Sequence, residues 1–428
     1  MNLNMELKEY KLGDLIEVTR GMSLPGEFYS TEGEYIRLTC GNFDYVNNSF
    51  KENKSKDDLY YVGKIKPEFI MEKGDIITPL TEQAIGLLGS TAIIPESGKY
   101  IQSQDVAKVT CKKGMIDHDF AYYLIPSKCV KEQLSAAAQQ TKIRHTSPDA
   151  IKACKVFVPP LSEQKKIASV LSALDDKIAL NKKMNQKLEA MAKRLYDYWF
   201  VQYDFPDKNG RPYKTTGGPM TYNTTLKREI PEGWEVKRLG ESVEVLKDGT
   251  HNPPARVENG IPLLTGTMFG ENFLDYTKAT YISKEDYLAI HSKYQPLKND
   301  IIITKIGTLG NVNILRDIDL PIAIHCNSAL LRFKKVFGSY YPFFFCKSDL
   351  FQLRLKSVKG QSIQEFASLD KIASVLCEIP SEEILKSFNN AVEPIMRQLI
   401  RTSKEVTRLT VLRDKLLPLL MNGQVTIK

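Results

Sequence analysis

The sequence predicts an α+β protein with two strand-rich mixed globular domains in tandem repeat. Two long helices separate these domains and are expected to pair as an antiparallel coiled coil with pseudo-twofold symmetry. Three observations predict this architecture: the second half of the chain repeats the first, short β-branched and aromatic runs fill each half, and two segments carry the apolar spacing of long paired helices.

The strongest internal signal is a repeat with a period near half of the 428 residues. A repeat of this length predicts the same fold for both copies. The matching stretches are YKLGDLIEV (10–18) with KRLGESVEV (237–245), EYIRLTCGNF (34–43) with GIPLLTGTMF (260–269), KGDII (73–77) with KNDII (298–302), and VFVPPLSEQKKI (156–167) with LCEIPSEEILKS (376–387). The order along the chain is therefore domain, helix, domain, helix.

Within each half, β-branched and aromatic runs alternate with glycine, proline, asparagine and aspartate, as in KGDIITP and NDIIITKIGTLGNVNIL. This pattern predicts a twisted sheet with irregular loops, and residues 119–138 are predicted to be helical. The predicted segments are domain 1 (1–160), a spacer helix (161–200), a linker rich in glycine, proline and threonine (201–230), domain 2 (231–380) and a second spacer helix (381–428).

Both spacer helices carry apolar residues at intervals of three and four, which is typical of a coiled-coil seam. The first has neither glycine nor proline in residues 161–205. Its residues 163–200 would span about 57 Å at roughly 1.5 Å per residue, on the order of 17 base pairs of duplex. The predicted seams are Asn181, Met184, Leu188, Met191, Leu195 and Tyr198 in the first helix, and Ile395, Leu399, Thr402, Val406, Leu409 and Leu416 in the second. The polar members, Asn181 and Thr402, are expected to fix the register.

Pro394 interrupts the pattern of the second spacer. Because proline is favoured in the first turn of a helix, we expect it to open a long helix that follows a short one. At the corresponding place in the first spacer, Asp175 and Asp176 are a plausible N-cap. Each spacer is therefore predicted to be a short helix followed by a long one.

Composition argues against several classes of protein. The seven cysteines lie far apart without a Cys-x-x-Cys pair, and the five histidines show no metal-binding spacing, so neither a disulfide framework nor a metal site is expected. The N-terminal residues lack the apolar run of a secretory signal, and the longest apolar stretches are shorter than the roughly 18 residues of a membrane span. These features predict a cytoplasmic protein. A net charge of +8 is compatible with a nucleic-acid partner but does not by itself indicate one.

Asn252-Pro253-Pro254 looks like the start of the Asn-Pro-Pro-aromatic motif of amino-methyltransferases, yet Ala255 stands where the stacking ring is required. The glycine-rich stretches GLLGS (86–90) and GTLGN (307–311) lack a G-x-G-x-x-G frame, and no ATP-binding P-loop motif is present. Pro206-Asp207 has no downstream strand with Glu-x-Lys to complete a nuclease motif. We therefore expect no catalytic residue, cofactor or metal in this chain, with a DNA adenine methyltransferase as the enzymatic alternative.

The chain resembles the specificity subunits of type I restriction-modification systems. The resemblance rests on PPLSEQKKIASVLSALDDKI (159–178), WFVQYDFPDKNGRPYKTTGG (199–218), EIPEGWEVKRLG (229–240) and LRDKLLPLLMNG (412–423), which together with the repeat cover the whole chain in the expected order. It implies two target-recognition domains that each bind one half of an asymmetric split DNA sequence. It also implies that the helices act as a spacer and as the dock for two methyltransferase subunits.

The resemblance further implies a non-catalytic subunit of a host-defence complex. The methyltransferase subunits would hold S-adenosylmethionine and modify adenine, and restriction subunits that use ATP and Mg would join through them. The expected partners are thus double-stranded DNA and these subunits, without a membrane. Two further alternatives remain: a coiled-coil adaptor whose globular ends bind proteins, and the specificity chain of a system with modification and cleavage fused in one partner.

The candidate DNA-binding residues are basic, amide or hydroxyl side chains expected on loops. DGTHNPPARVENG (248–260) aligns with RGMSLPGEFYSTEGE (20–34), the first loop of the other repeat. In the loop of residues 248–260, Gly249 permits a close backbone approach and the prolines stiffen the chain. The polar groups of this loop can reach phosphates or base edges. The alternative is a rigid surface turn without DNA contact. The candidates are Arg20, Arg37, Lys142 and Arg144 in domain 1, and Lys247, Thr250, His251, Asn252, Lys305, Lys359 and Gln361 in domain 2. If Lys305 contacts DNA, Lys305→Ala should weaken binding or lower its salt dependence.

Overall fold

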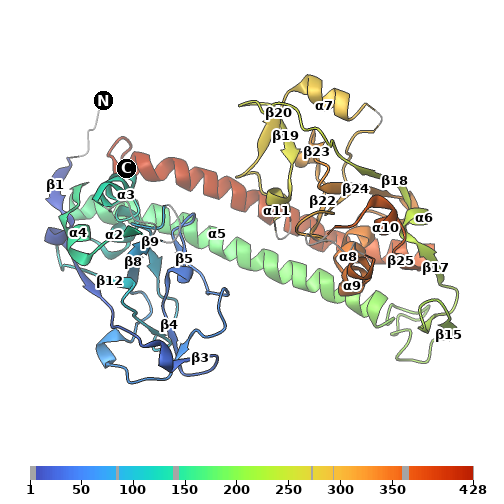
Figure 1. Ribbon diagram of the computed structural model, residues 1–428, viewed down its shortest axis with the longest axis horizontal. Helices are drawn as coiled ribbons and strands as arrows, with labels where there is room; N and C mark the ends of the chain where they lie inside the picture. The colour runs from blue at the N-terminus through green and yellow to red at the C-terminus, as the bar shows by residue number, and fades with distance from the viewer. Residues whose placement is uncertain are drawn as a thin grey trace. The chain divides into compact units, whose positions relative to one another are not determined.

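The computed structural model describes residues 6–82, 86–137, 144–270, 273–292, 294–358 and 366–427 (Figure 1). The chain forms two compact units. Unit 1 consists of Met1–Asn181 and Glu405–Lys428, and unit 2 consists of Lys182–Lys404. The predicted segments treated each spacer helix as separate, whereas each compact unit includes part of both helices because its globular domain packs on them.

In the described part of unit 1, the main antiparallel sheet has the strand order β10 (Ala92–Ile93), β8 (Ile76–Pro79), β12 (Val106–Cys111) and β2 (Ile16–Arg20). A second sheet has the order β11 (Tyr100–Ile101), β4 (Tyr35–Arg37), β7 (Tyr60–Tyr61) and β3 (Tyr29–Ser30). Shorter ladders pair β1 (Lys8–Lys11) with β14 (Lys155–Val158), β9 (Thr81–Glu82) with β13 (Arg144–His145), and β5 (Phe43–Asp44) with β6 (Ser49–Phe50). The short helices are α1 (Leu12–Leu15), α2 (His118–Leu124), α3 (Lys128–Ala137) and α4 (Pro148–Ala153).

In the described part of unit 2, the main sheet has the order β22 (Val312–Ile314), β21 (Ile301–Thr304), β24 (Ser328–Phe333) and β18 (Val243–Asp248). The second sheet has the order β20 (Thr280–Ile282), β19 (Ile261–Leu264) and β23 (Ala323–Ile324). Ladders pair β17 (Glu235–Arg238) with β25 (Leu376–Ile379), and β15 (Met220–Asn223) with β16 (Arg228–Pro231). The short helices are α6 (Leu239–Ser242), α7 (Lys284–Ile290), α8 (Tyr341–Lys347), α9 (Asp349–Ser357) and α10 (Leu369–Ala373).

The main sheets of the two units have the same strand order, which confirms the repeat predicted from the sequence. The order β10-β8-β12-β2 in unit 1 corresponds to β22-β21-β24-β18 in unit 2. The register agrees as well, since Arg20 lies opposite Ala107 and Asp248 lies opposite Ala329 at the ends of equivalent strands. The predicted α+β class with two strand-rich domains in tandem is therefore confirmed.

Each main sheet is buried on both faces, which explains the continuous apolar runs in its central strands. Ile76 of β8 packs with the helices of unit 1, whereas its neighbour Ile77 packs in a separate cluster with residues of the second sheet. Ile301 and Ile302 of β21 divide in the same way in unit 2. Successive side chains of a strand point to opposite faces, so each main sheet lies between a helical layer and a second sheet.

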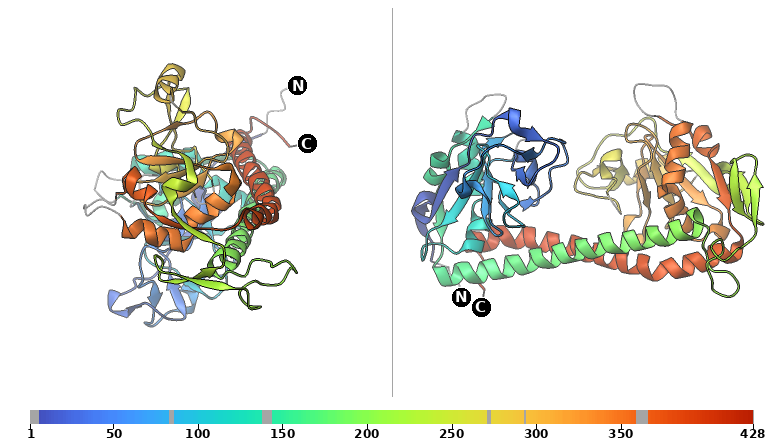
Figure 2. Two further views of the ribbon diagram at one scale, coloured as in Figure 1. Left: turned by 90° about the vertical axis from the view of Figure 1, so that its right-hand side faces the viewer. Right: turned by 90° about the horizontal axis from the view of Figure 1, so that it is seen from below.

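The two spacers, α5 (Leu161–Tyr196) and α11 (Glu382–Met421), are each one continuous α-helix (Figure 2). The predicted break in each spacer is wrong. Pro394 is exposed and lies inside α11 between buried apolar residues. Proline removes the hydrogen bond to the carbonyl of Asn390, but Asn390 is also exposed, so water can hydrate that carbonyl while the flanking apolar burial holds the helix together. Asp175 is no N-cap either, because it accepts hydrogen bonds from Tyr123 (2.7 Å) and Arg413 (2.9 Å) inside unit 1.

Within unit 2 the two long helices run antiparallel. Asn185 of α5 contacts Thr402, and further along α5 Tyr196 contacts Phe388, which lies nearer the start of α11. Thr402 Oγ1 donates a hydrogen bond to Asn185 Oδ1, and Asn185 Nδ2 donates one to Ser403 Oγ at 3.1 Å. Thr402, the polar residue of the second seam, therefore pairs with Asn185 of α5. Asn181, the polar residue expected in the first seam, is buried in unit 1.

The predicted seam is right for α11 and partly wrong for α5. In α11 every predicted member is buried or half-buried. In α5 and the π-helical turn Asp197–Val201 that follows it, the exposed members of the predicted seam are Met184, Met191 and Tyr198. The side chains one position later are buried instead, namely Asn185, Ala192 and Trp199. The sequence pattern selects the most apolar residues, whereas the close approach of two helices also favours small or paired side chains.

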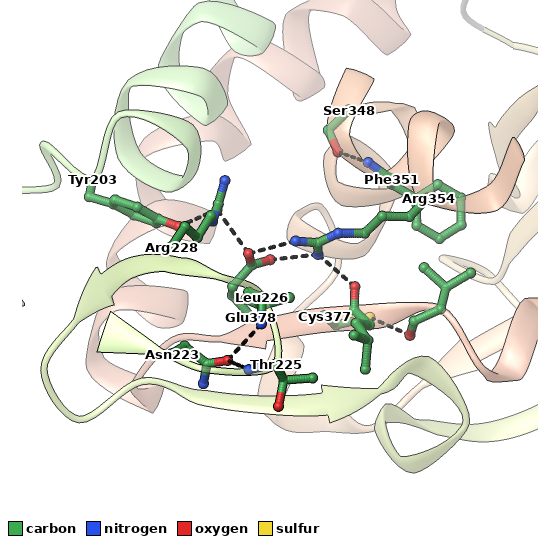
Figure 3. A network of polar contacts seen from close by, with 12 residues as sticks. Tyr203, Asn223, Thr225, Leu226, Arg228, Ser348, Phe351, Arg354, Cys377 and Glu378 are labelled. Carbon is green, nitrogen blue, oxygen red and sulfur yellow. Dashed lines mark hydrogen bonds and ion pairs between the residues drawn. The ribbon is translucent and has the colours of Figure 1, made fainter. Parts of the chain in front are cut away.

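Residues 201–230 do not form an irregular linker, because they belong to the fold of unit 2. β15 and β16 form a hairpin, and Tyr203 and Phe205 pack on the ring of Trp234. Arg228 of the hairpin lies 2.8 Å from Glu378 of β25, which Arg354 of α9 holds with two further hydrogen bonds of 2.9 Å (Figure 3). The aromatic side chains pack without a helical or strand period, so no periodicity marked this segment as folded.

Candidate nucleic-acid interface

Several predicted site residues meet at one end of the main sheet of unit 2. β18 ends at Asp248, the loop of residues 249–256 follows, and β24 begins beside it at Ser328. Lys305 directly follows the end of β21 at the same edge. We call the group formed by Asp248, His251, Lys305, His325 and Asn327 the sheet-end cluster of unit 2.

The loop of unit 2 begins with a close contact between two backbones. Thr250 N donates a hydrogen bond to Ile324 O at 3.0 Å, and Cys326 N donates one to Thr250 O at 3.1 Å. A Cβ on Gly249 would lie 1.6 Å from Ile324 O, so only glycine fits. The close approach expected of Gly249 therefore serves the protein's own backbone, and it fixes where the loop leaves the sheet.

An ion pair between a buried lysine and a half-buried aspartate lies at the base of this loop. Lys305 is 4% exposed, and its Nζ lies 2.8 Å from Asp248 Oδ2. His251 Nε2 lies 3.3 Å from the same carboxylate oxygen. Burial acts to raise the pKa of Asp248, but the hydrogen bond and charge of Lys305, with the nearby His251, outweigh it and hold that pKa below its usual value. The carboxylate is thus kept ionised between two nitrogen donors.

His325 is a second imidazole of the cluster. Its Nδ1 accepts a hydrogen bond from Asn327 N at 3.2 Å, which leaves Nε2 as the protonated nitrogen when the ring is neutral. Burial, and secondarily the nearness of His251, lower the pKa of His325. The neutral ring is therefore favoured, with a fixed arrangement of donor and acceptor.

The outer part of the loop presents polar groups to solvent. Lys247, His251 and Asn252 are exposed, and the side chain of His251 is 70% accessible. Thr250 Oγ1 donates a hydrogen bond to Asn252 O at 2.9 Å, which stiffens the turn before Pro253. The structure thus brings four of the predicted candidates together, Thr250, His251, Asn252 and Lys305, although Lys305 lies below the surface.

Unit 1 carries an equivalent sheet end with different side chains. A Cβ on Gly21 would lie 2.3 Å from Ser103 O, and Met22 N donates a hydrogen bond to Gln102 O at 3.2 Å, which repeats the backbone contact of unit 2. The polar side chains here include Thr81, whose Oγ1 lies 3.1 Å from Asp105 Oδ1, and Arg144, which lies 3.6 Å from Glu82. Arg20 is exposed at the end of β2, at the position of Asp248.

Other predicted site residues differ from expectation. Arg20, Arg37, Arg144 and Lys247 were expected on loops, but each lies on a strand. Arg37 is buried, donates to Asp58 O at 3.0 Å, and stacks on the ring of Tyr29 with its guanidinium carbon 3.8 Å from the ring centre. It therefore holds its own domain together. Lys142, Lys359 and Gln361 lie outside the described residues.

The sequence missed three members of the sheet-end cluster: Asp248, His325 and Asn327. Each is an unremarkable residue beside a strand, and only the pairing of that strand brings it to the loop. A signal was present, because matching the two repeats residue by residue places Asp248 with Arg20 and Asn327 with Asp105 at strand ends. At these positions the two domains share the backbone arrangement but carry different side chains, so these positions show where the two domains differ in surface chemistry.

Among the described residues, no three histidine, cysteine, aspartate or glutamate side chains are grouped so that they could hold a metal ion. The described helices include none that is long and apolar enough to cross a membrane.

The comparison with known protein families follows the repeat. The pattern of the type I restriction modification DNA specificity domain matches residues 4–190 and again residues 231–406, which is most of the chain. The chain therefore belongs to the family of type I restriction-modification specificity subunits, with two specificity domains in tandem.

Similar proteins agree over nearly the full length. The chain is 27% identical to the type I restriction enzyme MjaIX specificity subunit of Methanocaldococcus jannaschii, over 99% of this chain and 89% of that protein. It is 23% identical to the HindI specificity subunit of Haemophilus influenzae, over 98% of this chain and 99% of that protein. The crystal structure of a type I restriction-modification S subunit from M. genitalium shares the fold, with a TM-score of 0.60 and 18% identity, covering 100% of this chain and 98% of that one.

Proposed function

We propose that this chain is the DNA-recognition subunit of a type I restriction-modification complex, in which each globular domain binds one half of a bipartite, asymmetric DNA target. One observation carries the proposal. The two domains have the same sheet topology and the same glycine contact at the sheet end, yet present different polar side chains there. A common scaffold with different contact groups fits two half-sites of different sequence.

The long helices would set the separation of the half-sites and bind two methyltransferase subunits. In support, α5 is unbroken over Leu161–Tyr196, and an exposed apolar stripe at intervals of seven residues consists of Met184 and Met191 on α5 and Tyr198 in the π-helical turn Asp197–Val201 that follows. Met184 lies at the edge of the contact with α11, since its Sδ is 3.9 Å from Gln398 Nε2. Exposed apolar side chains along one helix face are suited to a protein partner.

The chain itself would perform no chemistry. The methyltransferase subunits would hold S-adenosylmethionine and modify adenine, and restriction subunits would use ATP and Mg. Ala255 supports this division, because no aromatic ring follows Asn252-Pro253-Pro254 to stack on a flipped adenine. The complex would work in the cytoplasm, where its DNA lies.

The decisive experiment is co-expression with the cognate methyltransferase in a host whose DNA is unmodified, followed by mapping of methylated adenines. We expect a split, asymmetric motif. A stable complex that adds no new motif contradicts the proposal, and S-adenosylmethionine binding by the purified chain alone would favour the methyltransferase alternative.

The helix surface can be tested separately by introducing charge into the stripe. We expect Met191→Glu, alone or with Met184→Glu, to weaken methyltransferase binding at least tenfold without changing the melting temperature, because both side chains are exposed. Gln186→Glu adds the same charge at an exposed position outside the stripe and serves as the control. Equal binding by the stripe variants and the control would exclude this face as the dock.

A further inference from the structure

Lys305, the lysine of the Asp248–Lys305 ion pair in unit 2, occupies a place where unit 1 has an apolar side chain. Leu80 N donates a hydrogen bond to Asp105 O, and Lys305 N donates one to Asn327 O, each immediately after the central strand of its main sheet. Leu80 and Lys305 are therefore equivalent, and Leu80 is fully buried. The fold accepts leucine at this position.

The lysine is thus not needed to build the sheet end. Moving an ammonium group out of water is costly, and a buried ion pair is often no more stable than well-packed apolar side chains of similar size. Lys305 is nevertheless buried, and its charge is directed to a single carboxylate, that of Asp248, the last residue of β18 before the loop. This arrangement indicates a role for the pair in orienting the loop.

The carboxylate of Asp248 links the buried lysine to the exposed surface. His251 Nε2 faces this carboxylate at 3.3 Å, which favours the proton on Nε2 and leaves Nδ1 as an acceptor. The backbone of Asp248 is fixed as well, because Tyr294 OH donates a hydrogen bond to its carbonyl oxygen at 2.8 Å. At the equivalent place in unit 1, Ser23 follows Arg20 by the same interval, so His251 has no counterpart there.

We infer that Lys305 and Asp248 are positioning residues that hold His251 for base recognition in the half-site bound by unit 2. His251 Nδ1 accepts a hydrogen bond from an exocyclic amino group, which adenine and cytosine present in the major groove. Lys305 contacts no phosphate, because Asp248 neutralises it below the surface. The inference rests on the proposed function of unit 2 as a DNA-binding domain and specifies which of its side chains select the base.

The test uses the full-length chain assembled with its methyltransferase. The variants are His251→Ala, Lys305→Leu and the double variant with Lys305→Leu and Asp248→Asn. The change at position 305 introduces the leucine that unit 1 has at the equivalent position. Lys298→Ala is the matched control, because Lys298 forms an exposed ion pair with Asp317 in the same unit at 2.6 Å. Three properties are measured: the melting temperature, the salt dependence of DNA binding, and the methylated motif at both half-sites.

We expect the double variant to melt at or above the wild-type temperature and to keep the wild-type salt dependence. Methylation of the wild-type target should fall at least tenfold, or the methylated motif should tolerate other bases at one position of the half-site bound by unit 2. The motif at the other half-site should be unchanged. His251→Ala should give the same change, and combining it with the double variant should add nothing further, because all three residues act on one contact.

Three results would overturn the inference. A salt slope lowered by about one unit in Lys305→Leu would make Lys305 a phosphate ligand. Failure of that variant to fold would make the pair structural. An unchanged motif in His251→Ala, whose exposed side chain is not needed for folding, would remove base contact by His251. In each case a split motif from the wild-type complex still supports the proposed function, whereas no motif from the wild type would refute that function itself.

Discussion

Phe157 in β14 of unit 1 and Glu378 in β25 of unit 2 occupy the same place in equivalent ladders, yet their surroundings differ. Phe157 pairs with Glu9 and is 53% exposed, whereas Glu378 pairs with Val236 and is buried under the hairpin of β15 and β16. The sheets are the same, and the difference arises from a segment that covers this face in unit 2. The two domains therefore keep the same topology while their polar contacts follow what lies against each sheet.

The largest expected effect comes from breaking the buried network of unit 2. Glu378→Ala would leave Arg228 and Arg354 without their shared carboxylate, and it should destabilise unit 2 by about 3 kcal/mol, since an uncompensated buried charge is costly. Multidomain proteins commonly depart from one-step unfolding, so hydrogen exchange resolved by domain is the suitable measurement.

Phe157→Ala at the equivalent place in unit 1 is the control for that experiment. Its side chain is half exposed, so we expect a loss below about 1 kcal/mol, confined to unit 1. Equal losses for the two variants would mean that the covering hairpin gives Glu378 no special role.

The second prediction concerns acid and separates the two units by their histidines. His291 in unit 2 is 2% exposed, and its Nε2 accepts a hydrogen bond from Ile324 N at 3.3 Å, whereas His118 and His145 of unit 1 are exposed. Burial lowers the pKa of His291 to about 4. As the pH falls below the unfolded-state pKa near 6.5, the unfolded chain binds a proton on His291 while the folded chain does not, so the free energy of unfolding decreases. This decrease continues until the pH reaches the folded-state pKa of about 4.

At pH 5 this linkage should remove about 2 kcal/mol from the unfolding free energy of unit 2, at roughly 1.4 kcal/mol per pKa unit. Denaturant titrations at pH 7 and pH 5 measure it, and unit 1 serves as an internal reference. His291→Gln keeps an acceptor for Ile324 N and has no titrating group, so it should abolish most of the difference. If the variant kept the full acid sensitivity, other groups of unit 2 would be responsible.

The same comparison shows what could be predicted from sequence. The strand-rich character of each half and the two long helices follow from local patterns, because strand and helix periods are properties of neighbouring residues. The repeat follows from matching the two halves of the sequence. Which face of α5 is buried did not follow, since Asn185 is buried with hydrogen bonds to Thr402 and Ser403 of α11, and Ala192 is buried although it is smaller than the exposed Met191 beside it. A periodic pattern of apolar residues does not predict which small or polar side chains are buried between two helices.

The candidate site was predictable only in part. The loop and the residues Thr250, His251 and Asn252 were identified from glycine, proline and polar content, which are local signals. The ion pair beneath the loop joins residues 57 positions apart, and Lys305 beside a glycine-rich stretch looks like a surface residue. Lys305 is buried directly after β21 and pairs with Asp248 at the end of β18, a contact that no local pattern reveals.

The smallest expected effect compares the two long helices. Pro394 in α11 and Ala173 in α5 lie at the same distance after the equivalent strands β25 and β14, and both helices continue through these positions. Alanine restores the backbone N–H that can donate to the carbonyl of Asn390, so Pro394→Ala should stabilise unit 2. The gain should be only about 1 kcal/mol, less than the full difference in helix propensity between proline and alanine, because the surrounding backbone has already adapted to the proline ring. Ser387→Ala, exposed in the same helix with its backbone donor intact, should change stability by less than about 0.5 kcal/mol. Domain-resolved hydrogen exchange measures both, and a destabilised Pro394→Ala would show that the proline ring contributes to the packing of α11 on unit 2.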